Sequence, residues 1–163
     1  MNVQDIVDFL RERELTLVTA ESCTAGLIAS TIADVKGAGD LLDCAFVTYS
    51  PSAKQKCLGV KPETISRFNL TSEQVAREMA LGALRCSSAN LAVANTGVTD
   101  GVDPRVAPGT QCYAWAFAAR TGEPTVFSET RRFEGDRNHV RQQSALYALE
   151  RIPDLFRQST IGR

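Results

Sequence analysis

Short apolar runs alternate along this chain with segments in which apolar residues recur at helical spacing. The helical segments are expected at residues 2–13, 24–33, 51–58 and 72–86, with a short helical turn opening at 61–62 and a final helix after Asp136. The apolar runs predict strands at residues 15–19, 41–49, 91–95, 111–118 and 125–133. Strands separated by helices favour a layered α/β fold, and the hairpin around Thr121-Gly122 makes its sheet mixed.

Capping residues mark where several of these helices begin. Ser50-Pro51 places an N-cap serine before a proline at the first helical position. Thr71 with Gln74 three residues later fits a capping box, so Thr71 is the expected cap of the helix at 72–86. Five apolar residues of the final helix are expected to face the core: Val140, Ala145, Leu149, Ile152 and Phe156.

Length and charge limit what kind of protein this is. A chain of 163 residues fits one domain of ordinary size. Eighteen basic and 19 acidic residues give a net charge of −1, too little to steer nucleic acid. The sequence contains no run of 18 apolar residues, which is the length needed to span a membrane as a helix. The first ten residues contain no Lys or Arg, unlike a signal peptide, so we expect a cytoplasmic protein.

The five cysteines give no metal-binding pattern. No two of them have CxxC spacing, and the chain has a single histidine, His139. A structural zinc site needs four closely spaced nitrogen or sulfur ligands, so we expect no metal. Reduced thiols that pack as small hydrophobic groups are the simpler interpretation.

The first candidate for chemistry is the junction at residues 19–26, where a strand leads directly into a helix. Ligands of α/β sheets gather where the strands end, and a helix start offers unpaired N–H groups. The Ser22 hydroxyl could attack a carbonyl group there while the N–H groups of the 22–26 turn hold the oxyanion. An ordinary capped helix start explains the same residues, and Cys23 is an alternative nucleophile.

The second candidate lies at the next strand-to-helix junction, which contains Tyr49 and Lys54. A serine nucleophile needs a base, and no histidine lies nearby. Lys54 could be that base if burial lowers its pKa, with Tyr49 as proton relay. A surface lysine beside a half-buried tyrosine is the alternative interpretation.

Two further segments could hold an anion. Thr96-Gly97 follows a strand and begins a loop that runs to Pro108-Gly109-Thr110, rich in residues that permit close backbone approach. Arg137 and Arg141 share a face of the last helix and could clamp a phosphate. A loop that merely crosses the sheet and a solvated helix surface are the alternatives.

Six short motifs occur in an order that resembles the C-terminal domain of the CinA (competence/damage-inducible) family. They are Glu21-Ser22-Cys23-Thr24-Ala25-Gly26, Tyr49-Ser50 with Lys54, Leu58-Gly59-Val60, Thr96-Gly97, Pro108-Gly109-Thr110, and Gly135-Asp136-Arg137 with Arg141. The resemblance spans about residues 4–156 and implies a stand-alone, single domain over residues 1–163. It implies a three-layer α/β/α fold with a mixed, mainly parallel sheet.

The resemblance also implies an activity and a set of residues. The expected reaction is hydrolysis of nicotinamide mononucleotide to nicotinate mononucleotide and ammonia, without metal or cofactor. The family's serine falls on Ser22, its tyrosine on Tyr49 and its lysine on Lys54. Substrate contacts are expected at Thr24, Gly26, Thr96, Gly97, Thr110 and Arg137.

The loop at 98–107 departs from the family's glycine-rich pattern. Asp100 and Asp103 stand there, and a carboxylate near a phosphate would weaken mononucleotide binding. The alternative to an amidohydrolase is therefore a weak or inactive relative that binds a nucleotide or a protein partner. In either case a homo-oligomer is expected.

Overall fold

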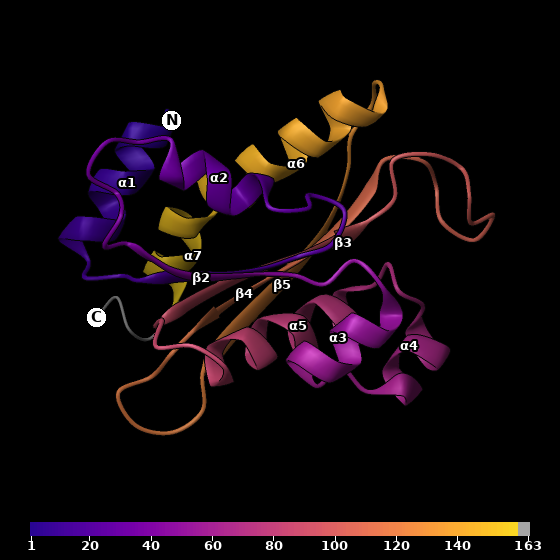
Figure 1. Cartoon of the computed structure of the whole chain (residues 1–163), viewed down its shortest axis with the longest axis horizontal. Coiled ribbons are helices and arrows are strands. Elements are labelled where there is room, and N and C mark those ends of the chain that lie inside the picture. Colours follow the sequence, from indigo (N-terminus) through magenta and orange to yellow (C-terminus); the bar gives the residue numbers. More distant parts are fainter. Residues whose placement is uncertain (160–163) are drawn as a thin grey trace.

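The computed structural model describes residues 1–159 (Figure 1). Within them the elements follow in the order α1 (Val3–Glu12), β1 (Leu17–Glu21), α2 (Leu27–Ala33), β2 (Leu42–Val47), α3 (Pro51–Leu58), α4 (Pro62–Phe68), α5 (Glu73–Arg85), β3 (Leu91–Gly97), β4 (Thr110–Phe117), β5 (Thr125–Arg132), α6 (Arg137–Glu150) and α7 (Ile152–Gln158). The last four residues of the expected domain, 160–163, lie outside the described residues.

The sheet has five strands in the order β2-β1-β3-β4-β5. β1 pairs in parallel with β2 and β3, whereas β3–β4 and β4–β5 are antiparallel. The layered α/β class and the mixed sheet are confirmed. The sheet is less parallel than expected, because β4 is antiparallel to both of its neighbours, so two of the four strand pairings are antiparallel. Since β1, β2 and β3 run in one direction, their carboxyl ends share one edge of the sheet.

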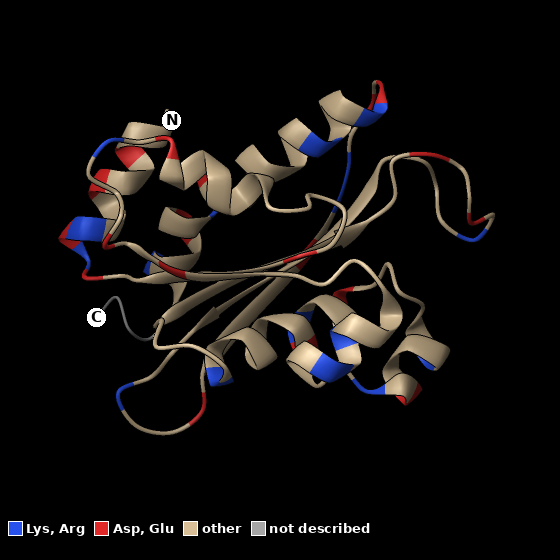
Figure 2. Ribbon diagram, in the orientation of Figure 1, with Lys and Arg blue, Asp and Glu red and all other residues tan. Residues whose placement is uncertain are grey.

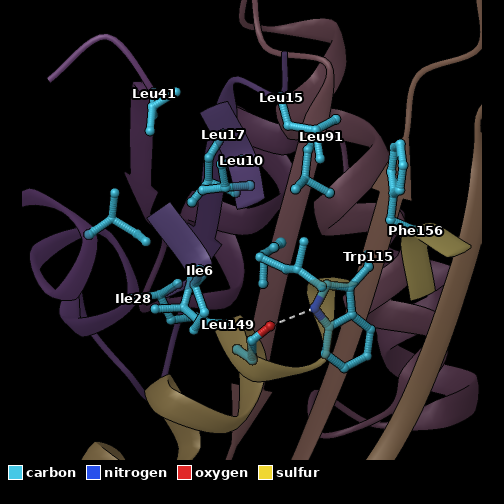
Figure 3. Packing of buried hydrophobic residues seen from close by; sticks show 14 of the residues in the cluster. Ile6, Leu10, Leu15, Leu17, Ile28, Leu41, Leu91, Trp115, Leu149 and Phe156 are labelled. Atoms are coloured by element: carbon cyan, nitrogen blue, oxygen red, sulfur yellow. Dashed lines mark hydrogen bonds between the residues drawn. The ribbon is translucent and has the colours of Figure 1, made fainter. Parts of the chain in front are cut away.

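Helices cover both faces of this sheet. Figure 1 shows α1, α2, α6 and α7 on one side and α3, α4 and α5 on the other. The first side has a core of large side chains, and Figure 3 shows Trp115 within it, donating its indole N–H to the Ala148 carbonyl oxygen at 2.8 Å. The second core is rich in alanine, which lets α5 approach the sheet closely. The three-layer α/β/α arrangement is therefore confirmed.

Several expected boundaries shift in the structure. β1 begins at Leu17 rather than at residue 15, and α2 begins at Leu27 rather than at residue 24. Ala25 and Gly26 have φ angles of 46° and 95°, so the chain makes a left-handed turn before α2 and cannot yet be helical.

Two predictions about helix ends were wrong. The cap of α5 is Ser72, whose hydroxyl accepts from the Val75 N–H at 3.2 Å, because the helix starts one residue later than the capping box required. The final helix is split into α6 and α7 at Arg151, where Pro153 occupies the first turn of α7. The five residues expected to face the core are buried nonetheless.

Charged residues of both signs occur in both helical layers (Figure 2). In the part of the chain that the structure describes, no helix is both long enough and apolar enough to cross a membrane.

Candidate active site

The shared edge of β1, β2 and β3 brings the first two candidate segments into contact. Ser22 follows β1, and Lys54 lies one turn into α3, which follows β2. The Lys54 Nζ lies 2.9 Å from the Ser22 Oγ. Side chains 32 positions apart in the sequence therefore form one pair, and the sequence-based pairing of these two residues agrees with the structure.

Lys54 is buried, with only 1% of its surface exposed. Its Nζ also donates to the backbone carbonyl oxygens of Thr48 at 2.7 Å and Tyr49 at 3.3 Å. Burial penalises the charged ammonium and lowers the pKa of Lys54 to about 8. The surface-lysine interpretation is thus excluded, and this amine can lose its proton near neutral pH.

Glu21 holds the turn that presents Ser22. Its fully buried carboxylate accepts from the backbone N–H groups of Gly26 at 3.1 Å, Ile28 at 2.9 Å and Ala29 at 3.1 Å. A carboxylate at a helix N-terminus accepts hydrogen bonds from the otherwise unpaired N–H groups, and its negative charge interacts favourably with the positive end of the helix dipole. Sequence reasoning quoted Glu21 in a motif without giving it a role.

Most backbone N–H groups of the 22–26 turn already have acceptors. The N–H groups of Ser22 and Thr24 donate to the backbone and side-chain oxygens of Asn95, at 3.0 and 3.2 Å. Those of Ala25 and Gly26 donate to the Ser22 carbonyl oxygen and to Glu21. Among residues 1–159, only the Cys23 N–H of this turn has no acceptor. Of the backbone N–H groups expected to bind the oxyanion, only the Cys23 N–H is therefore available.

Asn95 connects this turn to the centre of the sheet. It is fully buried, and its amide nitrogen donates to Gln111 Oε1 at 2.9 Å and Ser144 Oγ at 3.2 Å. Sequence reasoning missed Asn95 and Gln111. An asparagine at the end of an otherwise apolar strand was the available signal, because a buried amide needs partners.

A cavity of about 230 Å³ opens beside the Ser22–Lys54 pair. Its lining residues are Ser22, Cys23, Tyr49, Lys54, Asn69, Leu70, Thr71, Thr96, Gly97, Val98, Val102 and Asp103. The cavity thus includes both members of the pair, Tyr49 and two of the expected substrate contacts, Thr96 and Gly97.

The other expected substrate contacts lie outside this lining. Thr24 is fully buried, and Gly26 stands at the start of α2, with Glu21 accepting from its N–H. Thr110 lines a separate, larger cavity of about 720 Å³, together with residues 105–107 of the loop. Sequence spacing could not show which of these residues line which cavity, because that depends on the path of the 98–109 loop.

Tyr49 does not contact the pair through its hydroxyl group. Arg137 Nη2 donates to the Tyr49 hydroxyl oxygen at 2.9 Å, and Arg137 Nη1 donates to Thr99 Oγ1 at 2.9 Å. These contacts give no support to a relay between Tyr49 and Lys54; they place Tyr49 and Arg137 together at the rim. Arg141 donates instead to the backbone carbonyl oxygens of Cys23 and Thr24, so it holds the Ser22 turn from outside.

The two loop aspartates do not stand alone. Asp103 accepts from the guanidinium of Arg105 at 3.0 Å, and these hydrogen bonds hold the pKa of Asp103 far below its usual range. Asp100 lies 3.9 Å from Arg137. Each carboxylate therefore faces an arginine, which reduces the repulsion expected for a phosphate.

Cys23 lies in the cavity lining beside Ser22 and is 5% exposed. Burial raises the pKa of its thiol, which keeps it neutral and weakly nucleophilic. Among the described residues, no group of three or more His, Cys, Asp or Glu side chains could hold a metal ion.

Fold and site together define a class of protein: a layered α/β domain with a buried serine–lysine pair where its parallel strands end. The chain belongs to the CinA C-terminal domain family, which matches residues 2–156. It is 43% identical over 155 residues to a "Putative competence-damage inducible protein" of Symbiobacterium thermophilum, covering 91% of this chain but 36% of that protein. The chain therefore spans about a third of the length of that relative.

A shorter relative is covered almost completely. "Nicotinamide-nucleotide amidohydrolase PncC" of Escherichia coli is 40% identical over 153 residues, with 93% of this chain and 90% of that protein covered. Among solved structures, the "competence/damage inducible protein CihA" of Agrobacterium tumefaciens has a TM-score of 0.83 and 35% identity, covering 94% of this chain and 92% of that chain. These matches confirm the expected family and its fold.

Proposed function

We propose that this chain hydrolyses the carboxamide of a nicotinamide nucleotide, with Ser22 as nucleophile and Lys54 as base. The observation that carries the proposal is the 2.9 Å contact between Lys54 Nζ and Ser22 Oγ at a cavity wall. The relative named nicotinamide-nucleotide amidohydrolase, matched over nine-tenths of its length, supports the substrate class.

The first half-reaction begins with neutral Lys54. Its Nζ takes the proton of the Ser22 hydroxyl, and the Oγ attacks the carboxamide carbon. The Cys23 N–H donates to the carbonyl oxygen as negative charge develops on it. The carbon–nitrogen bond then breaks as the nitrogen takes the proton from the Lys54 ammonium. Ammonia departs, and the acyl group stays bound to Ser22 as an ester.

Water completes the reaction in a second half-reaction, in which water is the nucleophile and Ser22 is the leaving group. Lys54 takes a proton from water, the resulting hydroxide attacks the acyl carbon, and Ser22 leaves with the proton that Lys54 returns. The product is the nicotinate nucleotide. Tyr49 and Arg137, joined at the rim, bind the part of the nucleotide outside the cavity, where a guanidinium suits a phosphate.

The test is to incubate the purified chain with nicotinamide mononucleotide and measure both products. Ammonia and nicotinate mononucleotide should form in equal amounts, whereas nicotinamide, which lacks the ribose phosphate, should react far more slowly. If neither product forms at high enzyme concentration, the proposed activity is wrong and the non-enzymatic relative is the better account.

A further inference from the structure

Asn69 has a backbone conformation that only glycine adopts readily. It follows α4 and has φ 76° and ψ 160°. For a residue with a Cβ this region is strained, and such strain persists only where surrounding contacts enforce it. Asn69 also lines the cavity that contains Ser22 and Lys54. The strain therefore lies at the candidate site itself.

Three contacts enforce this conformation. The Asn69 side-chain nitrogen donates to Asp103 Oδ2 at 2.9 Å, its side-chain oxygen accepts from the Leu70 N–H at 2.8 Å, and its backbone carbonyl oxygen accepts from the Ser72 hydroxyl at 2.8 Å. Next to it, the Leu70 carbonyl oxygen accepts from Thr96 Oγ1 at 3.0 Å. The segment that follows α4 is thus fixed to α5, to β3 and to the loop after β3.

In the hydrogen bond with Asn69, the residue from the loop after β3 is Asp103. Besides Asn69, it accepts from the Arg105 backbone N–H at 2.9 Å and from the Arg105 guanidinium. At its other end the loop is held by Arg137, which donates to Thr99. Residues 98–103 are therefore attached to the rest of the domain through Thr99 and Asp103, and Figure 2 marks the charged residues along this loop.

Two valines of this loop line the cavity, and one of them is unusually exposed. Val102 is 82% exposed, although a valine side chain gains from burial. Val98 and Val102 are both part of the cavity lining. A flat ring in the cavity would cover Val102, and the pyridinium ring of a nicotinamide nucleotide, whose ring carbons can pack against valine, is such a ring.

From these contacts we infer that Asn69 and Asp103 are positioning residues of the site. Val98 is held separately by hydrogen bonds to Thr110 and Gln111. The Asn69–Asp103 hydrogen bond holds the part of the loop that carries Val102, so that Val102 and Val98 together form the wall against which the pyridinium ring of the substrate packs. The inference rests on the proposed function for the identity of the ring. The attachment of the loop by Asn69 is independent of it.

The test uses four variants with steady-state kinetics on nicotinamide mononucleotide. Asn69→Gly relieves the backbone strain and removes the contact, so KM should rise about tenfold while kcat stays within about twofold; tenfold corresponds to 1.4 kcal/mol. Asp103→Asn removes the charge that holds Arg105 and should act in the same direction. Asn69→Asp places two carboxylates together and should raise KM further.

The exchanged pair Asn69→Asp/Asp103→Asn should bring KM back towards the wild-type value. Arg105 Nη2 already lies 3.4 Å from the Asn69 side-chain oxygen, so a carboxylate at position 69 can replace the lost partner. A merely structural role would change the melting temperature without such a rescue of KM. Asn2→Gly, at the start of α1, is the matched control and should leave KM unchanged.

Hydrogen exchange decides the attachment without any turnover. The N–H groups of Arg105 and Val106 donate to Asp103, so both should exchange faster in Asn69→Gly than in the wild type and in Asn2→Gly. An unchanged exchange rate there, or an unchanged KM in a folded, active Asn69→Gly, would overturn the inference. Absence of wild-type turnover would refute the proposed function and leave the exchange measurement to decide the attachment.

Discussion

Lys54 is a long charged side chain that this fold buries and surrounds with oxygen atoms. The sequence could suggest a lysine base near Ser22, because both residues follow strands whose ends meet at one sheet edge. It could not locate the Tyr49 hydroxyl, which depends on where α6 places Arg137. Contacts between a strand end and a helix 88 positions away follow from the tertiary structure.

The pH dependence of the rate tests Lys54 as the base. Only the neutral amine accepts a proton, and its pKa is about 8, so kcat/KM should rise with pH and level off above that value. Lys54→Met should lower kcat by about 10²–10⁴-fold. Lys56→Met, which removes an exposed lysine of the same helix, should not. A rate that is flat between pH 6 and 9 in the wild type would exclude this role.

Burial of Lys54 also predicts how stability changes with pH. Its pKa falls from 10.5 to about 8 on folding, so between these values the unfolded chain binds a proton that the folded chain does not. The free energy of unfolding therefore rises with pH in this window, by about 3 kcal/mol in total. Urea unfolding at pH 7 and 10 should show this rise in the wild type relative to Lys54→Met. The same pH dependence in both proteins would contradict it.

Helix α3 carries Lys54 and packs on α5. At one point in this contact the backbone of α3 lies directly against Gly82 of α5, with no side chain between them. A Cβ at Gly82 would lie within the contact distance of the Leu58 backbone, at the end of α3. Close approach therefore requires glycine here, although glycine costs a helix interior about 1 kcal/mol relative to alanine. The position of α3, and with it Lys54, depends on this contact.

Gly82→Ala should consequently destabilise the protein by about 1–3 kcal/mol despite the better helix propensity of alanine. It should also lower kcat, because α3 moves and the Lys54–Ser22 contact lengthens. Gly39→Ala is the matched control: a Cβ at Gly39 meets no atom within 4 Å. Urea unfolding and steady-state kinetics measure both effects, and a fully stable, fully active Gly82→Ala would refute the packing argument.

At this scale the sequence predicts which elements exist better than where they end. Apolar periodicity identified the strands and most helices, because each must bury one face. The start of α2 was wrong by three residues, since the left-handed turn at Ala25 and Gly26 accompanies the Glu21 carboxylate that holds the first N–H groups of the helix. Periodicity carries no information about such a turn.

Across the whole molecule, the site joins three strand ends, the start of α3 and the loop after β3. The sequence placed Ser22, Lys54, Thr96 and Gly97 in one site, and the cavity contains all four. It could not assign Thr110 or the loop aspartates, because their surroundings depend on the path of residues 98–109. The expected homo-oligomer stays a prediction, which light scattering of the purified chain would test.

The central claim is that Ser22, and not the neighbouring Cys23, attacks the amide. Ammonia release from nicotinamide mononucleotide by the wild type, Ser22→Ala and Cys23→Ala, compared at one pH above 8, tests it most directly. Ser22→Ala should fold normally and release no ammonia above background. Cys23→Ala keeps the backbone N–H that binds the oxyanion and should retain most of the activity. Wild-type ammonia release by Ser22→Ala, or its loss only in Cys23→Ala, would contradict the account.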